Sequence, residues 1–197
     1  MLIASYLPTT FCDYPGKVAA IIFTRGCNFR CPWCHNKHLI DFTDVSCFDA
    51  AAIIAEVSER CRAGMLDGLV ITGGEPTAQA DLLDFLRECK AAGIPVKLDT
   101  NGSRPDVLRA CFAEGLVAFV AMDVKAPLGK YDLLCGVAVD VGAIRKSIAL
   151  IAASGVPHQF RTTVVPELLN EGDVEKIKGM LPEGEEVVLQ AYRPVSG

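Results

Sequence analysis

The segment VAAIIFTRGCNFRCPWCHN, residues 18–36, joins a short apolar run to a loop that carries three cysteines. Its first part, residues 18–24, is rich in Val, Ile and Ala, which is typical of a strand buried on both faces. Similar runs follow along the chain at residues 68–72, 95–99, 118–123, 158–164 and 186–192. Between the runs, apolar residues recur at helical spacing. We therefore expect parallel β/α units.

Six strands are fewer than the eight of a complete barrel, which takes about 250 residues. We expect an α/β fold, a partial, open (β/α)6 TIM-like barrel formed by a single domain over residues 1–197. A flat, doubly wound sheet is the alternative. Residues 2–14 could add a further strand ahead of the turn at Pro15 and Gly16.

Composition narrows the class of protein. The chain has 197 residues, of which 51% are hydrophobic, so it can bury a core. The longest apolar run, residues 116–122, is far below the ~18 residues of a membrane span. A net charge of -5 disfavours a general nucleic-acid binder. Nine cysteines without an export signal indicate a reducing cytoplasm, with some thiols serving a metal.

Glycine and polar residues gather directly after the predicted strands. Residues 72–76 read TGGEP, residues 99–102 read DTNG and residues 123–125 read DVK. In β/α barrels the carboxyl ends of the strands form the active-site face. These segments are therefore expected to meet at one rim.

The cysteine loop has the spacing Cys27-x3-Cys31-x2-Cys34. Three thiolates on one loop can hold a soft metal or an iron–sulfur cluster. Three ligands leave one iron of a four-iron cluster free for an outside ligand. The alternative is a non-catalytic zinc-binding module, in which His35 or His38 completes a closed Cys3His site.

Two carboxylates end neighbouring predicted strands, Asp99 and Asp123. They could be helix N-caps, or they could lie close enough to require a cation between them. Lys125 is expected to point inward at the rim. Arg161 could face the site, whereas His158 has no partner in the sequence and is expected to be structural.

The motifs resemble those of one superfamily. CNFRCPWC (residues 27–34) has the CxxxCxΦC form of the radical S-adenosylmethionine superfamily, with Trp33 as the aromatic residue, and ITGGEP (71–76) resembles its GGE motif. KLDTNG (97–102) and AMDVKAP (121–127) resemble the glycyl-radical-enzyme activating enzymes. The likeness is greatest to the group that activates anaerobic ribonucleoside-triphosphate reductase, and it runs from about residue 7 to residue 193.

The resemblance implies the chemistry. Cys27, Cys31 and Cys34 would bind a 4Fe–4S cluster whose open iron is chelated by S-adenosylmethionine. One electron, from a flavodoxin- or ferredoxin-type donor, would then release methionine and a 5′-deoxyadenosyl radical, which generates a glycyl radical on a partner enzyme. That partner is expected to be anaerobic ribonucleoside-triphosphate reductase. The alternative within the superfamily is an enzyme that acts on a small molecule or on another glycyl-radical enzyme.

The resemblance also implies roles for single residues. Trp33 and His35 would lie beside the adenine, Gly73 and Gly74 would let the backbone approach the methionine part, and Glu75 would accept from its ammonium group. Asp99, Thr100 and Asp123 would help to hold the cofactor and a monovalent cation, and Lys125 would contact the cofactor's carboxylate or ribose. At the position nearest to a cofactor-binding His of some relatives, this chain has Tyr192, to which we do not assign that role. The other cysteines are not expected to bind a second cluster: Cys12, Cys47, Cys61, Cys89, Cys111 and Cys135.

Overall fold

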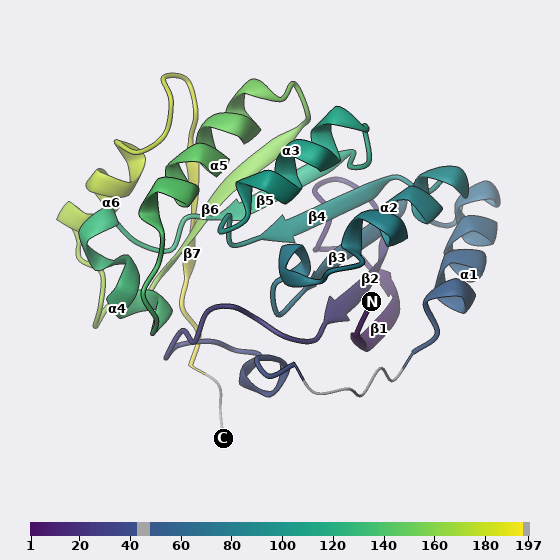
Figure 1. Ribbon diagram of the computed structural model, residues 1–197, viewed down its shortest axis with the longest axis horizontal. Coiled ribbons are helices and arrows are strands. Elements are labelled where there is room, and N and C mark those ends of the chain that lie inside the picture. The colour runs from purple at the N-terminus through teal and green to yellow at the C-terminus, as the bar shows by residue number, and fades with distance from the viewer. Residues whose placement is uncertain (43–47, 195–197) are drawn as a thin grey trace.

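All strands of the computed structural model, which describes residues 1–42 and 48–194, lie in one seven-stranded sheet (Figure 1). Their order is that of the sequence: β1 (Ile3–Thr10), β2 (Ala19–Thr24), β3 (Gly68–Gly73), β4 (Val96–Thr100), β5 (Phe119–Asp123), β6 (His158–Val164) and β7 (Val187–Ala191). The first pair is antiparallel and every later pair is parallel. A doubly wound sheet would reverse its strand order, so that alternative is wrong and the partial barrel is confirmed.

The six strands expected from apolar runs are each confirmed to within one residue at either end. The segment expected to add a strand also does so, because β1 pairs antiparallel with β2. Since β1 and β7 are the two edges of the sheet, the barrel is open between them.

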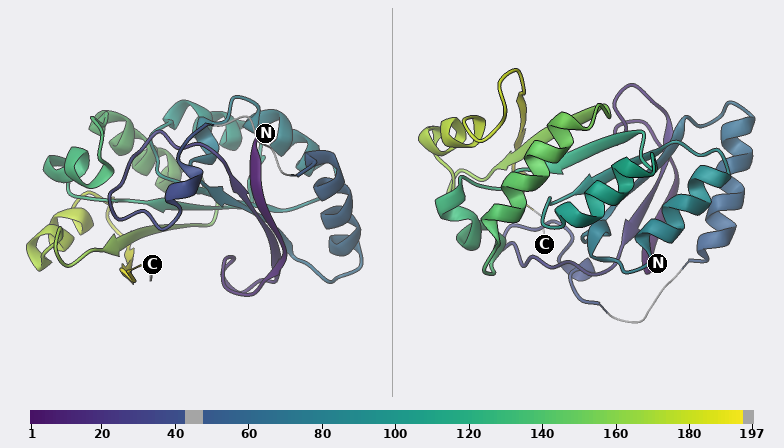
Figure 2. Two further views of the ribbon diagram at one scale, coloured as in Figure 1. Left: turned by 90° about the horizontal axis from the view of Figure 1, so that it is seen from below. Right: turned by 45° about the horizontal axis from the view of Figure 1, so that its top comes forward.

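The helices lie along the outer side of the curved sheet (Figure 2). They are α1 (Ala50–Arg62), α2 (Leu82–Ala91), α3 (Pro105–Ala113), α4 (Tyr131–Cys135), α5 (Val141–Ala153) and α6 (Glu171–Lys178), with short 3-10 turns at Lys37–Leu39, Pro76–Ala78 and Leu128–Lys130. Side-chain caps begin three of them, because Asp49, Asp140 and Asn170 accept from backbone amides of the first turn. The short helix α4 has no counterpart in the periodic pattern of the sequence.

Two apolar clusters lie on opposite faces of the sheet. Ala20 and Ile22 of β2 belong to the large cluster beneath the helices. Ile21, one residue away on the same strand, packs with Tyr14 and Val70 in a small cluster on the concave face. Tyr14 comes from the β1–β2 loop, so this cluster fills the concave side near the amino ends of the strands. Space for a ligand remains at the carboxyl ends.

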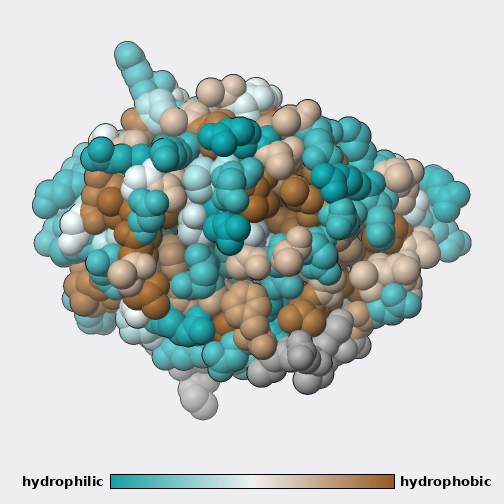
Figure 3. Space-filling model, in the orientation of Figure 1, coloured by the Kyte–Doolittle hydropathy of each residue, from teal (hydrophilic) through white to brown (hydrophobic). Residues whose placement is uncertain are grey.

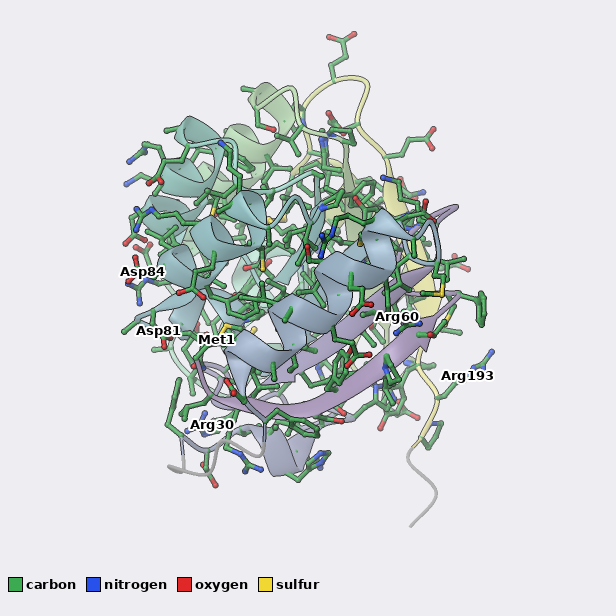
Figure 4. All side chains as sticks on the ribbon, turned by 90° about the vertical axis from the view of Figure 1, so that its right-hand side faces the viewer. Met1, Arg30, Arg60, Asp81, Asp84 and Arg193 are labelled. Atoms are coloured by element: carbon green, nitrogen blue, oxygen red, sulfur yellow. The ribbon has the colours of Figure 1, made fainter. Side chains whose placement is uncertain are left out.

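Polar contacts join β1 to the helical layer. Arg60 of α1 donates from Nη2 to Thr9 Oγ1 at 2.7 Å, and the amino group of Met1 pairs with Asp81 ahead of α2 (Figure 4). Over the helices, hydrophilic and hydrophobic residues are interspersed on the surface (Figure 3). Across the described residues, no helix is both long and apolar enough to cross a bilayer.

We predict that Leu98→Ala will lower the free energy of unfolding by about 2–5 kcal/mol, because this side chain of central strand β4 is fully buried. Leu133→Ala is the matched control, since that leucine is 61% exposed and should change stability by no more than about 0.5 kcal/mol. Denaturant unfolding of both variants is the measurement. Equal losses would contradict the assignment of β4 to the core.

Candidate functional site

One cavity lies at the carboxyl edge of the parallel strands. Every residue that the sequence singles out for the site lines it: Cys27, Cys31, Trp33, Cys34, His35, Gly73, Gly74, Glu75, Asp99, Thr100, Asp123 and Lys125. They come from the cysteine loop and from the ends of β3, β4 and β5. The expected meeting at one rim is therefore confirmed, while the role of each residue stays a prediction.

The turn after β3 packs directly on the end of β2. Gly74 N donates to Thr24 O, and Glu75 N donates to Gly26 O, both at 2.8 Å. A Cβ on Gly74 would lie 2.1 Å from Gly26 O, and one on Gly73 would lie 2.3 Å from Thr24 N. Gly73 also has a φ of +113°, which side-chain-bearing residues rarely adopt. Both glycines are thus required by backbone packing before any ligand is considered.

The Glu75 carboxylate fastens this turn to the end of β4. Its Oε1 accepts from Thr77 N (3.0 Å), Thr77 Oγ1 (2.6 Å) and Thr100 Oγ1 (2.7 Å), and its Oε2 accepts from Asn101 N at 2.7 Å. Burial raises the pKa of Glu75, and these four hydrogen bonds oppose that rise. The sequence predicts an ammonium partner for Glu75. In the structure its hydrogen bonds hold two strand ends together, and Oε2 accepts only one of them.

The cysteine loop is ordered by its own backbone. Cys27 N donates to Ile40 O at 2.9 Å, and Cys34 N donates to Cys31 O at 3.1 Å, which folds the loop into a turn. Cys31 is buried, whereas Cys27 and Cys34 are half-buried. Burial raises the pKa of the Cys27 thiol to about 11. A metal bound here would reverse this, because a coordinated thiol is deprotonated outright.

Cys135, at the end of α4, lies behind the cysteine loop, a contact that sequence reasoning missed. Its side chain is fully buried, and its carbonyl oxygen accepts from Arg30 N at 2.7 Å. Interaction with the neighbouring thiol lowers the pKa of Cys31 and raises that of Cys135, which burial raises further. The next residue, Gly136, lies so close to the loop that a Cβ there would be 2.3 Å from Arg30 O. No motif in the sequence links α4 to the cysteine loop.

Two aromatic contacts flank the cavity. The Lys125 ammonium lies 5.1 Å from the centre of the buried Trp33 ring, whose Nε1 donates to Leu134 O at 3.1 Å. On the exposed side, the rings of His35 and Tyr192 lie 5.3 Å apart, and His35 Nε2 lies 2.6 Å from the carbonyl oxygen of Arg193. The end of β7 therefore lies against the cysteine loop.

A row of alternating charges crosses the ends of β4, β5 and β6. Lys97 Nζ lies 2.7 Å from Asp99 Oδ1, and both terminal nitrogens of Arg161 lie 3.3 Å from Asp99 Oδ2. Arg161 Nε donates to Asp123 Oδ1 at 2.9 Å, and Lys125 Nζ lies 3.2 Å from Asp123 Oδ2. Burial would raise the pKa of Asp123, but Lys125 and Arg161 hold it below its usual range. Arg161 thus bridges two residues that line the cavity, Asp99 and Asp123.

The remaining singled-out residues lie elsewhere. His158 does have a partner, contrary to expectation, because its Nε2 lies 3.0 Å from Glu185 Oε2; this contact away from the cavity agrees with a structural role. Cys89 and Cys111 are buried under their helices, Cys61 is half-buried and Cys12 is exposed. Cys47 lies outside the described residues.

Among the described residues, no three His, Cys, Asp or Glu side chains are placed to hold one metal ion. Three thiols on one loop can serve a single zinc ion or an iron–sulfur cluster. Iron, sulfide and zinc content of the anaerobically purified protein distinguishes the two.

We predict that Gly74→Ala will destabilise the fold by about 1–3 kcal/mol, because the new Cβ meets backbone that cannot move aside without shifting the cysteine loop. Gly129→Ala is the control, since a Cβ there meets nothing within 4 Å. Thermal unfolding should show a midpoint lower by roughly 2–4 °C per kcal/mol for Gly74→Ala only. An unchanged midpoint would mean that the turn does not support the loop.

Comparison with known proteins agrees with this geometry. Residues 21–181 match the Radical SAM superfamily. A protein of Methanocaldococcus jannaschii that is named as a glycyl-radical enzyme activating enzyme is 33% identical over 199 residues, which cover 98% of this chain and 80% of the relative. The pyruvate formate-lyase-activating enzyme of Listeria monocytogenes is 33% identical over 97 residues, which cover 46% of this chain and 37% of that enzyme.

The fold is also found in solved structures. Streptococcus suis SuiB bound to S-adenosylmethionine superposes with a TM-score of 0.61 at 15% identity, over 86% of this chain and 38% of that one. At this identity the likeness shows the fold alone, whereas the sequence matches show the family. The chain therefore belongs to the radical S-adenosylmethionine superfamily of enzymes and, within it, to the glycyl-radical-enzyme activating enzymes.

Proposed function

We propose that this enzyme generates a glycyl radical on a larger partner protein. The observation that carries the proposal is that the three cysteines and the predicted cofactor residues line one cavity in a sheet that stays open between β1 and β7. A glycine in the backbone of a partner protein can react only if the loop that carries it reaches the cofactor. An open sheet provides that access, and we propose that residues 1–197 form a single domain built in this way.

The two edge strands support an interaction with protein rather than with a small molecule alone. Leu7 on β1 is 48% exposed, and Val188 and Leu189 on β7 are 41% and 47% exposed. Edge strands with exposed apolar side chains are prone to pair with another chain. A partner segment that enters the open side would cover these residues.

Cys27, Cys31 and Cys34 would hold a 4Fe–4S cluster, with S-adenosylmethionine on the open iron. When bound, the two groups supply reductive cleavage of the sulfonium and a carbon radical that abstracts hydrogen. The chain's own residues would bind and orient these two groups. Lys125 would contact the cofactor's carboxylate or ribose, Trp33 and His35 would flank its adenine, and the backbone at Gly73 and Gly74 would border its methionine part. The reductant would be a flavodoxin- or ferredoxin-type protein, and the partner an anaerobic ribonucleoside-triphosphate reductase.

The monovalent cation is not part of this proposal. Asp99 and Asp123 were expected to hold it, with help from Thr100. Both carboxylates are instead bound to side-chain cations, and the Thr100 hydroxyl donates to Glu75. The residues present therefore do not fit a dissociable cation between the two strand ends.

We predict that replacing any one of Cys27, Cys31 or Cys34 by Ala will prevent assembly of a stable four-iron cluster. Iron and sulfide content after anaerobic reconstitution is the measurement. Cys89→Ala and Cys135→Ala are the controls: the first thiol is buried in a helix face, and the second lies beside Cys31 but outside the loop. Cluster loss in Cys135→Ala with retention in Cys31→Ala would contradict the ligand assignment.

We predict that the reduced enzyme with S-adenosylmethionine alone will release 5′-deoxyadenosine slowly, because no hydrogen donor is positioned. An anaerobic ribonucleoside-triphosphate reductase should accelerate the release and acquire an organic radical. For each glycyl radical, one electron enters the sulfonium, one methionine leaves, and the glycine Cα hydrogen ends in one 5′-deoxyadenosine. Electron paramagnetic resonance of the mixture should show the doublet of a Cα–H-coupled glycyl radical.

A partner with Gly→Ala at the radical site is the control for that experiment and should stay free of the radical. A different glycyl-radical enzyme that gains the doublet would correct the partner but keep the function. Turnover of a small molecule, with every candidate partner remaining radical-free, would contradict the activating function and favour the small-molecule alternative.

A further inference from the structure

The charge row at the strand ends contains more cations than carboxylates. Lys97, Arg161 and Lys125 face Asp99 and Asp123, which leaves one positive charge in excess. All four carboxylate oxygens lie within 3.3 Å of a side-chain nitrogen, but Asp99 Oδ1, 2.7 Å from Lys97 Nζ, is held by charge alone and accepts no hydrogen bond. The nearby Glu75 carboxylate does not join the row, because its partners are Thr77, Thr100 and Asn101.

Displacing these side-chain cations from the row is energetically costly. The Lys97 side chain is 2% exposed, and its ammonium also donates to the carbonyl oxygen of Asp13 below the cavity. Arg161 is 15% exposed and spans both carboxylates. Removing the partner of a buried charge leaves that charge uncompensated, which is strongly unfavourable. A dissolved cation that bound Asp99 or Asp123 would have to displace one of these groups.

The geometry assigns to Arg161 and Lys97 the part of a built-in cation, which neutralises Asp99 and Asp123 so that no dissolved monovalent cation is required. The excess positive charge then remains available for an anionic group, such as the carboxylate of the cofactor. This inference rests on the proposed cofactor site, but the exclusion of a dissolved cation is testable without the cofactor.

The first test measures direct binding of Na⁺ in a tetramethylammonium buffer. The readout is the broadening of the ²³Na nuclear magnetic resonance line. The wild type should broaden the line no more than Arg145→Gln, a control at an exposed residue of α5. Arg161→Gln frees one oxygen of each carboxylate and should bind Na⁺ saturably. Lys97→Met, an apolar replacement of similar length, frees Asp99 Oδ1 and provides a second variant if Arg161→Gln fails to fold.

The second test is the affinity of the reconstituted enzyme for S-adenosylmethionine in K⁺, Na⁺ and tetramethylammonium salts at one ionic strength. The wild-type affinity should vary less than about twofold. Arg161→Gln should bind about tenfold more weakly in tetramethylammonium and regain affinity in K⁺ or Na⁺, while Arg161→Lys should stay independent of salt. Rescue by a small cation is not expected from a merely structural defect.

Saturable Na⁺ binding by the wild type would overturn the inference. So would a loss of S-adenosylmethionine affinity in Arg161→Gln that is equal in all salts. Failure of the wild type to bind S-adenosylmethionine in every salt would instead contradict the proposed function. The Na⁺ titration would still decide whether the row excludes a dissolved cation.

Discussion

The contact between the backbones at the ends of β2 and β3 is the constraint on which the site depends. Gly74 and Glu75 donate from their amides to Thr24 and Gly26, and this approach leaves no space for a side chain. Because Gly26 is held in this way, Cys27 starts from a fixed strand end rather than from a free loop. The GGE turn and the cysteine loop are therefore one structural unit, although some 40 residues separate them in the sequence.

Strand register supplies the second half of the site. Asp123 and Arg161 are direct partners in the β5–β6 ladder, so their ion pair follows from the pairing of the two strands. Lys97 and Asp99 lie two residues apart on β4 and therefore share a face. A slip of one residue would turn Arg161 toward the helices and break the row. The order of the charges in the row is consequently fixed by the order and register of the strands.

Much of this could be predicted from the sequence. Buried parallel strands are continuous apolar runs, so their positions are visible, and their carboxyl ends must meet at one edge. Lateral contacts are different, because they depend on register and on helix placement. The bridge that Arg161 makes between two carboxylates, the burial of Lys97 and the contact of Cys135 with Cys31 all join distant segments. The comparisons show the family and leave the single roles to experiment.

Because the sheet is open, a dissolved cation at its edge would be able to exchange with solvent. A cavity that admits a partner's loop also admits water between encounters, and a dissolved cation could exchange with that water. Side-chain cations on β4 and β6 cannot be lost in this way, since Lys97 and Arg161 are tied to the sheet itself. They orient Asp99 and Asp123 before any ligand arrives, which reduces the reorganisation needed on binding. The open partial barrel and the proposed built-in cation would thus serve the same end, a site that is ready when the proposed partner arrives.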